Sequence, residues 1–505
     1  MAISEGSRLG AQSDGGVSLP VSGREYGALP RRAVIAGAAL AVPAVALTVS
    51  TPAWAASGTN VTLSAPNMQA PAAGAVSVTA VVTNASGQPV SGEAVSFSGP
   101  AGSTFSPSST TTDGSGQAVS QLDLGTPWAK PGSSATVSAT SGSDTGSTAL
   151  TVLGSNLVVA GYGYSSTPGQ SELVFPSSVV DACGMGNPSW FLVLLTDGSV
   201  WAKGPNQNGQ LGDGSTTDRS TWAPVPGLSG VTQIAAGTAS GYAVLSDGSV
   251  KAWGANGSGQ LGIESTTDQW SPVQVSGLTS GVTQVSTGAT HVLALMSDGS
   301  VKAWGNNGSG QVGDGSTTNR LSPVQVSGLT SGVTQVAGGA FASYALSSDG
   351  SVKAWGSNGA GQVGDGSKTT RRTPVQVSGL TSGVTQVTAG ALSGYALSSD
   401  GSVKAWGYNG NGELGDGSST SSTTPVRVSG LNSGVTQIGA GYASGYALLS
   451  DGAAKAWGKN DSGQLGDGST TNRATPVSVA LPSGHAVKRL AASTSIPLDA
   501  FVIMG

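Results

Sequence analysis

Short runs of alternating apolar and polar residues follow one another along most of the chain, a pattern typical of strands. Between residues 57 and 154, runs such as 76–82 and 135–139 are separated by clusters of Gly, Pro, Ser and Asn. Alternation with a period of two marks strands with one buried face. We therefore expect residues 57–154 to form a β-sandwich.

From residue 155 onward the pattern recurs with a fixed period. Residues of two types stand 51 positions apart: the tryptophans Trp253, Trp304, Trp355, Trp406 and Trp457 and the aspartates Asp247, Asp298, Asp349, Asp400 and Asp451. A period of roughly 40 to 50 residues with several short strands per repeat predicts a propeller or a solenoid.

Each repeat is predicted to contain four strands. In one repeat these cover residues 322–326, 333–336, 344–348 and 351–355. Asp349-Gly350 is expected to close the last hairpin as a type I′ turn, because both central residues of that turn need positive φ. A lone four-stranded repeat would expose apolar side chains on both faces, and only a closed ring covers them all.

The two ends of this region together predict one further repeat. Asp-Gly hairpins account for six complete repeats, while residues 486–492 and 500–505 resemble the first strands of another that then stops. Residues 157–163 match the missing last strand. We expect these segments to pair and to close a seven-bladed β-propeller over residues 155–505, so truncating either end should open the ring.

Two stretches resemble known families. Residues 355–364 read Trp-Gly-Ser-Asn-Gly-Ala-Gly-Gln-Val-Gly, and this pattern recurs through residues 155–505. It is similar to the repeats of the regulator of chromosome condensation family, which implies a propeller that binds partners. Residues 57–154 resemble a bacterial immunoglobulin-like domain of the invasin and intimin type, through Gly-Gln-Pro-Val-Ser-Gly at 87–92 and Thr-Asp-Gly-Ser-Gly-Gln-Ala at 112–118. That family supplies mainly spacers and adhesive stalks.

The N-terminus carries the features of a bacterial export signal. Arg31 and Arg32 precede the uncharged stretch 33–55, which ends in Ala-Trp-Ala. A basic pair, an apolar run and a small-x-small ending are typical of a cleaved signal, and the paired arginines resemble a twin-arginine signal. A retained membrane anchor is the alternative, which two prolines within the stretch oppose. We expect residues 1–55 to be removed, leaving a secreted or cell-wall-associated protein without a membrane span.

The charge pattern argues against nucleic acid as a partner. Charged residues make up 9% of the chain, the formal net charge is −5, and no run rich in lysine or arginine occurs. Duplex binding depends on basic residues that neutralise phosphates. The single cysteine, Cys183, excludes an intramolecular disulfide and is expected to be a small buried side chain, with a reactive thiol as the alternative.

Residues that could carry out catalysis are sparse. His291 and His485 are the only histidines, and in other repeats the position of His291 is held by Ser240, Ala342, Ser393 and Ser444. A hydrogen-bonded structural role is therefore expected for His291. No Ser-His-Asp set, metal cluster or isolated carboxylate pair emerges. We expect no enzymatic activity, no metal and no cofactor; the alternative is an enzyme that uses carboxylates in the central channel.

An aspartate and an arginine recur six residues apart in one loop of most repeats. The pairs are Asp213 with Arg219, Asp314 with Arg320, Asp365 with Arg371 and Asp467 with Arg473. In the second repeat Ile263 and Gln269 replace both members together, whereas Asp416 stands opposite Ser422 in the fifth. Joint loss predicts a local ion pair. A calcium site is the alternative, although one carboxylate per loop supplies few oxygens.

Large side chains in loops that are otherwise built of small residues are the candidate partner-binding positions. The loops after the second predicted strands carry Thr238-Ala239, Ala289-Thr290, Ala340-Phe341, Ala391-Leu392 and Tyr442-Ala443, and the first repeat inserts residues 185–190 there. We select Trp190, Phe341, Leu392 and Tyr442, because aromatic residues dominate binding hot spots. The alternative is that these side chains fill gaps between neighbouring loops.

These observations predict a secreted, monomeric, non-catalytic propeller that recognises an extracellular protein through loops on one face. The alternative function is attachment to the cell envelope or matrix, in which the propeller holds a glycan or surface protein and the sandwich acts as a stalk. Two further functions come from resemblance. Guanine-nucleotide exchange, known from the eukaryotic family, is opposed by export and by the acidic charge. The resemblance of residues 342–346 to a secreted propeller that inhibits β-lactamases does not transfer a target, because the repeats of that protein are shorter.

Overall fold

The chain is all-β wherever its structure is described. A computed structural model describes residues 59–64, 76–99, 104–123, 134–141, 144–151, 157–160, 171–173, 179–185, 190–480, 487–490 and 500–504. These residues form strands, turns and bends and include no helix, which confirms the predicted all-β class for this part of the chain. The predicted export signal, residues 1–55, lies outside the described residues. A helix suited to crossing a membrane is absent from the described ranges.

Two antiparallel sheets occupy the described part of residues 59–151. One sheet has the order β1-β2-β6-β4, with strands Thr59–Ser64, Val76–Asn84, Gln117–Asp123 and Thr104–Ser106. The other has the order β5-β3-β7-β8, with strands Ser109–Thr111, Ala94–Ser98, Ser134–Ser141 and Asp144–Thr151. Val78, Val95 and Val137 from the two sheets are buried in one core. The pair of sheets is therefore a β-sandwich.

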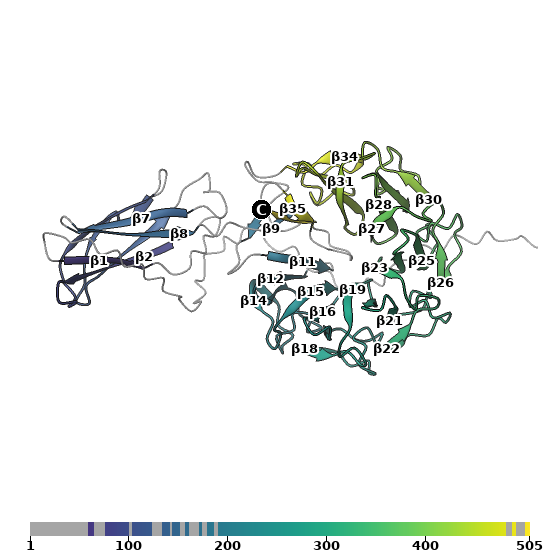
Figure 1. Cartoon of the computed structure of the whole chain (residues 1–505), viewed down its shortest axis with the longest axis horizontal. Helices are drawn as coiled ribbons and strands as arrows, with labels where there is room; N and C mark the ends of the chain where they lie inside the picture. The colour runs from purple at the N-terminus through teal and green to yellow at the C-terminus, as the bar shows by residue number, and fades with distance from the viewer. Residues whose placement is uncertain are drawn as a thin grey trace, which may run out of the picture. The chain divides into compact units, whose positions relative to one another are not determined.

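The described residues from 157 to 504 form seven four-stranded antiparallel sheets (Figure 1). Six sheets follow the chain order. They are β11–β14 (Val179–Met185, Trp190–Leu195, Val200–Gly204, Arg219–Pro224), β15–β18 (Val231–Ala236, Ser240–Leu245, Val250–Gly254, Gln269–Gln274), β19–β22 (Val282–Thr287, His291–Met296, Val301–Gly305, Arg320–Gln325), β23–β26 (Val333–Gly338, Ala342–Ser347, Val352–Gly356, Arg371–Gln376), β27–β30 (Val384–Ala389, Ser393–Ser398, Val403–Gly407, Ser422–Arg427) and β31–β34 (Val435–Ala440, Ser444–Leu449, Ala454–Gly458, Arg473–Ser478).

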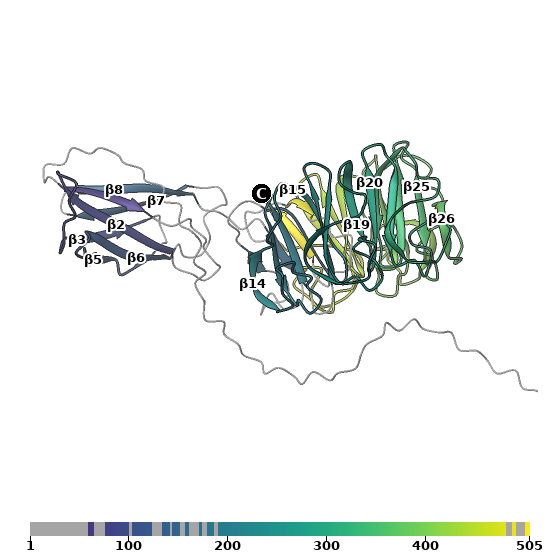
Figure 2. The same ribbon diagram turned by 90° about the horizontal axis from the view of Figure 1, so that it is seen from below.

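The remaining sheet joins the two ends of the repeat region. Its order is β10-β9-β36-β35, built from Ser171–Leu173, Leu157–Ala160, Ala500–Met504 and Val487–Leu490. β9 pairs antiparallel with β36, with Ala160 opposite Ala500. The predicted pairing of the 157–163 segment with the C-terminal segment is confirmed for the residues that lie in these strands. In Figure 2 the strands of the repeat region run between two sets of loops, one at each face.

The hairpin at Asp349-Gly350 forms, but its turn type differs from the prediction. Gly350 has φ 77°, whereas Asp349 does not have positive φ. The amide of Gly350 donates to Ser347 O (2.9 Å), and the Asp349 carboxylate accepts from the amide of Ser351 (2.9 Å). This is a type I turn followed by a left-handed glycine, a common three-residue hairpin connection. The side-chain hydrogen bond of the aspartate favours this turn over type I′.

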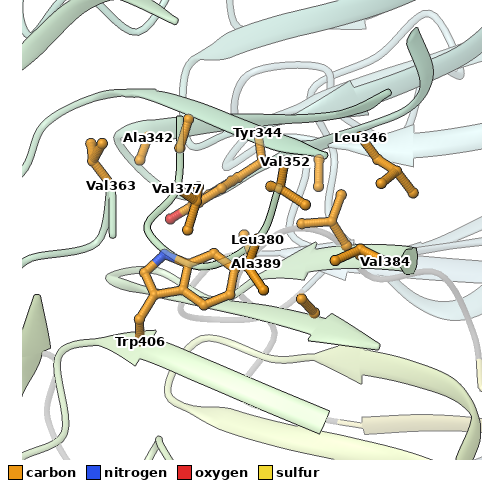
Figure 3. Packing of buried hydrophobic residues seen from close by; sticks show 14 residues of the cluster. Ala342, Tyr344, Leu346, Val352, Val363, Val377, Leu380, Val384, Ala389 and Trp406 are labelled. Carbon is orange, nitrogen blue, oxygen red and sulfur yellow. The ribbon is translucent and has the colours of Figure 1, made fainter. Parts of the chain in front are cut away.

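The hydrophobic core of the repeat region lies between neighbouring sheets. Figure 3 shows Trp406 of β29 packed beneath Tyr344 and Val352 of the preceding sheet. The Tyr344 and Trp406 rings meet edge to face with centroids 6.0 Å apart, and the indole Nε1 donates to Gln362 O (2.9 Å) in the preceding sheet. The equivalent bond recurs for Trp253, Trp304, Trp355 and Trp457. Each of these sheets thus buries apolar surface that it could not cover alone.

Candidate functional site

Glutamine side chains on the first strands of the chain-ordered sheets from β15 onward form hydrogen bonds with the next sheet along the chain. Gln233 of β15 donates through Nε2 to Val285 O (3.1 Å) and accepts from the Val285 amide (2.8 Å) of β19. Bonds of the same kind are made by Gln284, Gln335, Gln386 and Gln437. The first strands of neighbouring sheets therefore lie side by side. The loops that follow these strands all lie at the same end of the strands.

We call these loops, residues 237–239, 288–290, 339–341, 390–392 and 441–443, the inner loops. Backbone hydrogen bonds join each to the next: Thr238 N to Ala289 O (3.0 Å), Ala289 N to Ala340 O (3.2 Å), Ala340 N to Ala391 O (3.2 Å) and Ala391 N to Tyr442 O (2.8 Å). Glycine makes this approach possible. A Cβ on Gly390 would lie 2.9 Å from Gly441 O. Side chains on the inner loops are thus presented from a braced backbone.

Three predicted binding residues lie on three consecutive inner loops. Phe341, Leu392 and Tyr442 are each partly exposed. The loops of the two preceding sheets carry only alanine and threonine at these positions, as Thr238, Ala239, Ala289 and Thr290. The large side chains are therefore gathered on three consecutive inner loops, which we call the inner-loop sector.

Tyr408 lies beside this sector and was not among the predicted residues. Its amide donates to Leu392 O (2.9 Å), and its side chain is 40% exposed. The ring packs over Gly410, where a Cβ would lie 2.1 Å from the tyrosine hydroxyl. The residue after each strand-ending Gly could have indicated it, because the other sheets carry Ala255, Asn306, Ser357 and Lys459 there.

Trp190 is not part of this surface, and its selection as a binding candidate is corrected here. The side chain is 1% exposed and belongs to a buried cluster with Leu192 and Trp253. Trp190 is the first residue of β12, a position that corresponds to Ser240 and His291 in later sheets. Its Nε1 donates to Thr238 O (3.0 Å), so the buried indole helps to fix the inner loop at residues 237–239.

The recurring aspartates and arginines form local ion pairs, as predicted. Arg219 Nε lies 2.8 Å from Asp213 Oδ2. The other three predicted ion pairs also form: Asp314 with Arg320, Asp365 with Arg371, and Asp467 with Arg473. Burial raises the pKa of Asp365, but hydrogen bonds from Ser367 and Arg371 and the arginine charge outweigh it and hold that pKa below its ordinary value. Each aspartate also accepts hydrogen bonds from a serine of its own loop, so these contacts stabilise the conformation of the loop.

His291 and Cys183, which the sequence also singled out, are buried. His291 Nε2 lies 2.9 Å from Ser343 Oγ, and burial lowers the pKa of His291 to about 3. Cys183 is buried as predicted, and burial together with the negative charge of Asp181 raises the pKa of its thiol well above the ordinary value. His485 lies outside the described residues. Among the described side chains, no group of three or more His, Cys, Asp or Glu is placed to hold a metal ion.

Comparison with known proteins relates this arrangement to a family. The profile described as the RCC1-like domain matches residues 142–496. The chain is 32% identical over 210 residues to the ultraviolet-B receptor UVR8 of Arabidopsis thaliana, a match that covers 41% of this chain and 48% of UVR8. It is 32% identical over 342 residues to the human E3 ubiquitin-protein ligase HERC2, covering 65% of this chain and 7% of HERC2. The chain therefore spans less than half the length of these relatives.

Solved structures share the fold. Human WBSCR16 aligns with a TM-score of 0.60 at 24% identity, covering 69% of this chain and 99% of that protein. Yeast RCC1 (Prp20), crystallised with Kap60, aligns with a TM-score of 0.59 at 22% identity, covering 70% and 89%. Another structure of Prp20p from Saccharomyces cerevisiae aligns with a TM-score of 0.58 at 22% identity over 70% and 92%, and was described with its binding to Gsp1p and histones.

Proposed function

Because this chain belongs to the RCC1-like domain family, we propose that its β-propeller is a scaffold that recognises a protein partner and catalyses no reaction itself. The observation that carries the proposal is the sector formed by Phe341, Leu392, Tyr408 and Tyr442. A braced backbone presents large side chains there at little cost in conformational entropy, which favours binding. The family supports a binding role, since Prp20 was crystallised with Kap60 bound.

The same proposal includes the architecture around this sector. We propose that the seven sheets between residues 157 and 504 are the blades of a closed ring. We also propose that the sandwich is an immunoglobulin-like spacer and that the mature protein acts outside the cell. The run of apolar residues after Arg31 and Arg32 supports export, and the two packed antiparallel sheets support an immunoglobulin-like fold for the sandwich.

Affinity capture tests the proposed binding sector. The mature protein is immobilised and exposed separately to culture medium and to purified cell wall. We expect a soluble protein to be retained by the parent and lost with the double variant Phe341→Ala, Tyr442→Ala. Truncating two central hot-spot residues weakens binding by about 100-fold or more.

The control variant is Thr238→Ala, Thr290→Ala, on the inner loops that carry small residues. It should retain the partner like the parent, and all three proteins should have the same thermal midpoint. Equal capture by the parent and the double variant would show that another surface binds. Retention of cell-wall glycan in place of any soluble protein would support the attachment function.

A further inference from the structure

Two exposed apolar side chains stand at the same position in the last strands of two neighbouring sheets, on the opposite edge of each sheet from the strand that precedes the inner loop. Trp270 of β18 and Leu321 of β22 are 50% and 37% exposed. Each is the second residue of the last strand of its sheet. The same position in the other chain-ordered sheets holds Ser220, Arg372, Thr423 and Ala474. We call Ile263, Glu264, Trp270 and Leu321 the outer patch.

The backbone of the outer patch is fixed at the joints between sheets. Trp270 O accepts a hydrogen bond from the Gly214 amide (2.8 Å), and Leu321 O accepts one from the Glu264 amide (2.8 Å). The indole lies against Gly209, where an added Cβ would be 2.5 Å from the ring. One side of the ring is thus supported by the neighbouring loop while half of its surface remains open to solvent.

The loop before Trp270 departs from its counterparts at three positions together. Ile263, Glu264 and Gln269 stand where the β21–β22 loop has Asp314, Gly315 and Arg320. Glu264 has φ 61° and is the one non-glycine residue with positive φ within the described ranges. That conformation costs a residue with a side chain about 1 kcal/mol, and glycine adopts it freely in the sister loops. Strain that the repeat could avoid is typical of a functional position.

The departure also leaves negative charge without a local arginine. Glu264 is exposed and Asp268 is partly exposed, while Gln269 takes the place of the pairing arginine. In the equivalent β25–β26 segment, Lys368, Arg371 and Arg372 accompany Asp365. The outer patch thus combines an open aromatic face at one joint with an aliphatic side chain and an exposed carboxylate, Glu264, at the next.

We propose that the outer patch docks a basic segment of a partner protein. A basic side chain of the segment lies on the indole of Trp270 at one joint, and further along the segment a second basic residue pairs with Glu264 and an apolar residue packs on Leu321 at the next joint. A cation over a tryptophan face gains attraction from the ring, and a carboxylate forms a charge-assisted hydrogen bond with a basic side chain. The site is independent of the inner-loop sector, so either surface can function without the other.

Immobilised peptides test this chemistry directly. The full chain is measured against peptides that alternate leucine with arginine, leucine with glutamate, or leucine with serine. We expect binding to the arginine series alone, weakened by about tenfold in Trp270→Thr. Added salt should also weaken it, because exposed charges are screened. Threonine already occupies this position as Thr423, so the variant should fold.

Glu264 separates charge from backbone strain in the same assay. Glu264→Asn keeps a residue that tolerates positive φ and removes the charge, whereas Glu264→Gly restores the residue of the sister loops. Both should weaken binding of the arginine series about tenfold, and Glu264→Gly should raise the thermal midpoint. The variant Phe341→Ala, Tyr442→Ala should bind these peptides like the parent, which distinguishes this site from the inner-loop sector.

Several results would overturn the proposal. These are no binding of the arginine series, equal binding of the glutamate series, or unchanged binding by Trp270→Thr. Binding of soluble glycans that depends on Trp270, without peptide binding, would identify the patch as a carbohydrate surface and would also refute a basic protein segment as its occupant.

Discussion

A buried glutamate shows how single residues depart from the repeat. Glu413 is 2% exposed and occupies a position held by Gln210, Gln260, Gln311, Gln362 and Gln464 elsewhere. Its carboxylate accepts from the amide of Asn411 (2.8 Å), as the Gln362 side chain does from Ala360 (2.9 Å). Burial raises the pKa of Glu413 in spite of these hydrogen bonds. Burial therefore destabilises the ionised carboxylate of Glu413 at this position, whereas a neutral glutamine amide carries no such cost.

We predict that Glu413→Gln stabilises the protein at pH 7 by on the order of 1 kcal/mol, a typical cost of burying a polar group without full compensation. Since the folded pKa lies above the unfolded one, the glutamate costs stability as pH rises through that interval. The gain should vanish below about pH 4, where the carboxyl is protonated in both states. Thermal midpoints at pH 7 and pH 4 measure it.

The reverse substitution is a matched control. Gln362→Glu places the same carboxyl in the equivalent slot of the preceding sheet and should lower the midpoint at pH 7. A midpoint for Glu413→Gln at or below that of the parent at pH 7 contradicts the argument.

His291 illustrates a coupled change that the sequence alone could not explain. The tyrosine found in four other sheets is Leu293 here, so the Gln311 carbonyl lacks the phenol that binds Gln362 O from Tyr344 (2.6 Å). Ser343 Oγ donates to Gln311 O instead (2.8 Å) and contacts His291. The structural role predicted for His291 agrees with this network, whose third member lies in the next sheet.

Among the elements, the strands were predictable because their pattern repeats. The predicted strands 333–336 and 351–355 correspond to β23 and β25 with ends shifted by one or two residues. The misplacement of Trp190 comes from the extra residues that its repeat has before β12. Trp190 stands seven residues before Asp197, as Ser240 stands before Asp247, so counting from the repeated aspartate gives its buried position. Tyr408 was missed because its neighbour Leu392 lies on another loop of the same sheet.

The ion-paired loops make a prediction at the level of one element. Asp365 is almost fully buried and binds Ser367, Asn358 and Arg371, whereas the β17–β18 loop has replaced both ion-pair members with Ile263 and Gln269. We predict that Asp365→Ile or Arg371→Gln alone costs on the order of 1 kcal/mol. The double variant should cost less than the sum, because the unpaired partner is removed as well.

The pH dependence of the stability should reveal the same Asp365–Arg371 ion pair. Because the folded pKa of Asp365 is lowered, its contribution is complete above the ordinary aspartate value and is lost as pH falls through the folded pKa. Chemical denaturation from pH 7 to pH 3 should therefore show a shallower loss of stability for the double variant. Strict additivity of the two single variants would argue that the loop has no coupled pair.

At the scale of the whole molecule, one sheet links the two ends of the series of sheets. The sheet that contains β36 contacts both ends of the series: Gln437 donates to Leu490 O (3.0 Å), and Arg489 reaches Val180 O (3.1 Å) and Asp181 (3.3 Å). At the joints between the chain-ordered sheets from β15 onward, a neutral glutamine holds the corresponding place. The contact between the sheet that contains β36 and the sheet β11–β14 is thus made by a charged pair, Arg489 and Asp181.

We predict that deleting residues 500–505 lowers the stability by on the order of 5 kcal/mol, comparable with that of a small domain. The deletion removes β36, which lies between β9 and β35, and so leaves β9 and β35 without a common neighbour. Differential scanning calorimetry should show a lower and broader transition of the repeat region. Removal of residues 1–55 is the control and should leave that transition unchanged, and an unaltered transition after the C-terminal deletion would mean that the link between the two ends is not needed for stability.

The charged joint also bears on how such a chain can change over generations. Arg489 and Asp181 belong to the terminal repeats, while the interior repeats meet through interchangeable glutamines. Unequal recombination within the interior would duplicate or delete a whole 51-residue module and leave both terminal modules as they are. A protein with one interior module more or fewer would thus keep the Arg489–Asp181 pair, and the packing of its sheets would have to accommodate the change.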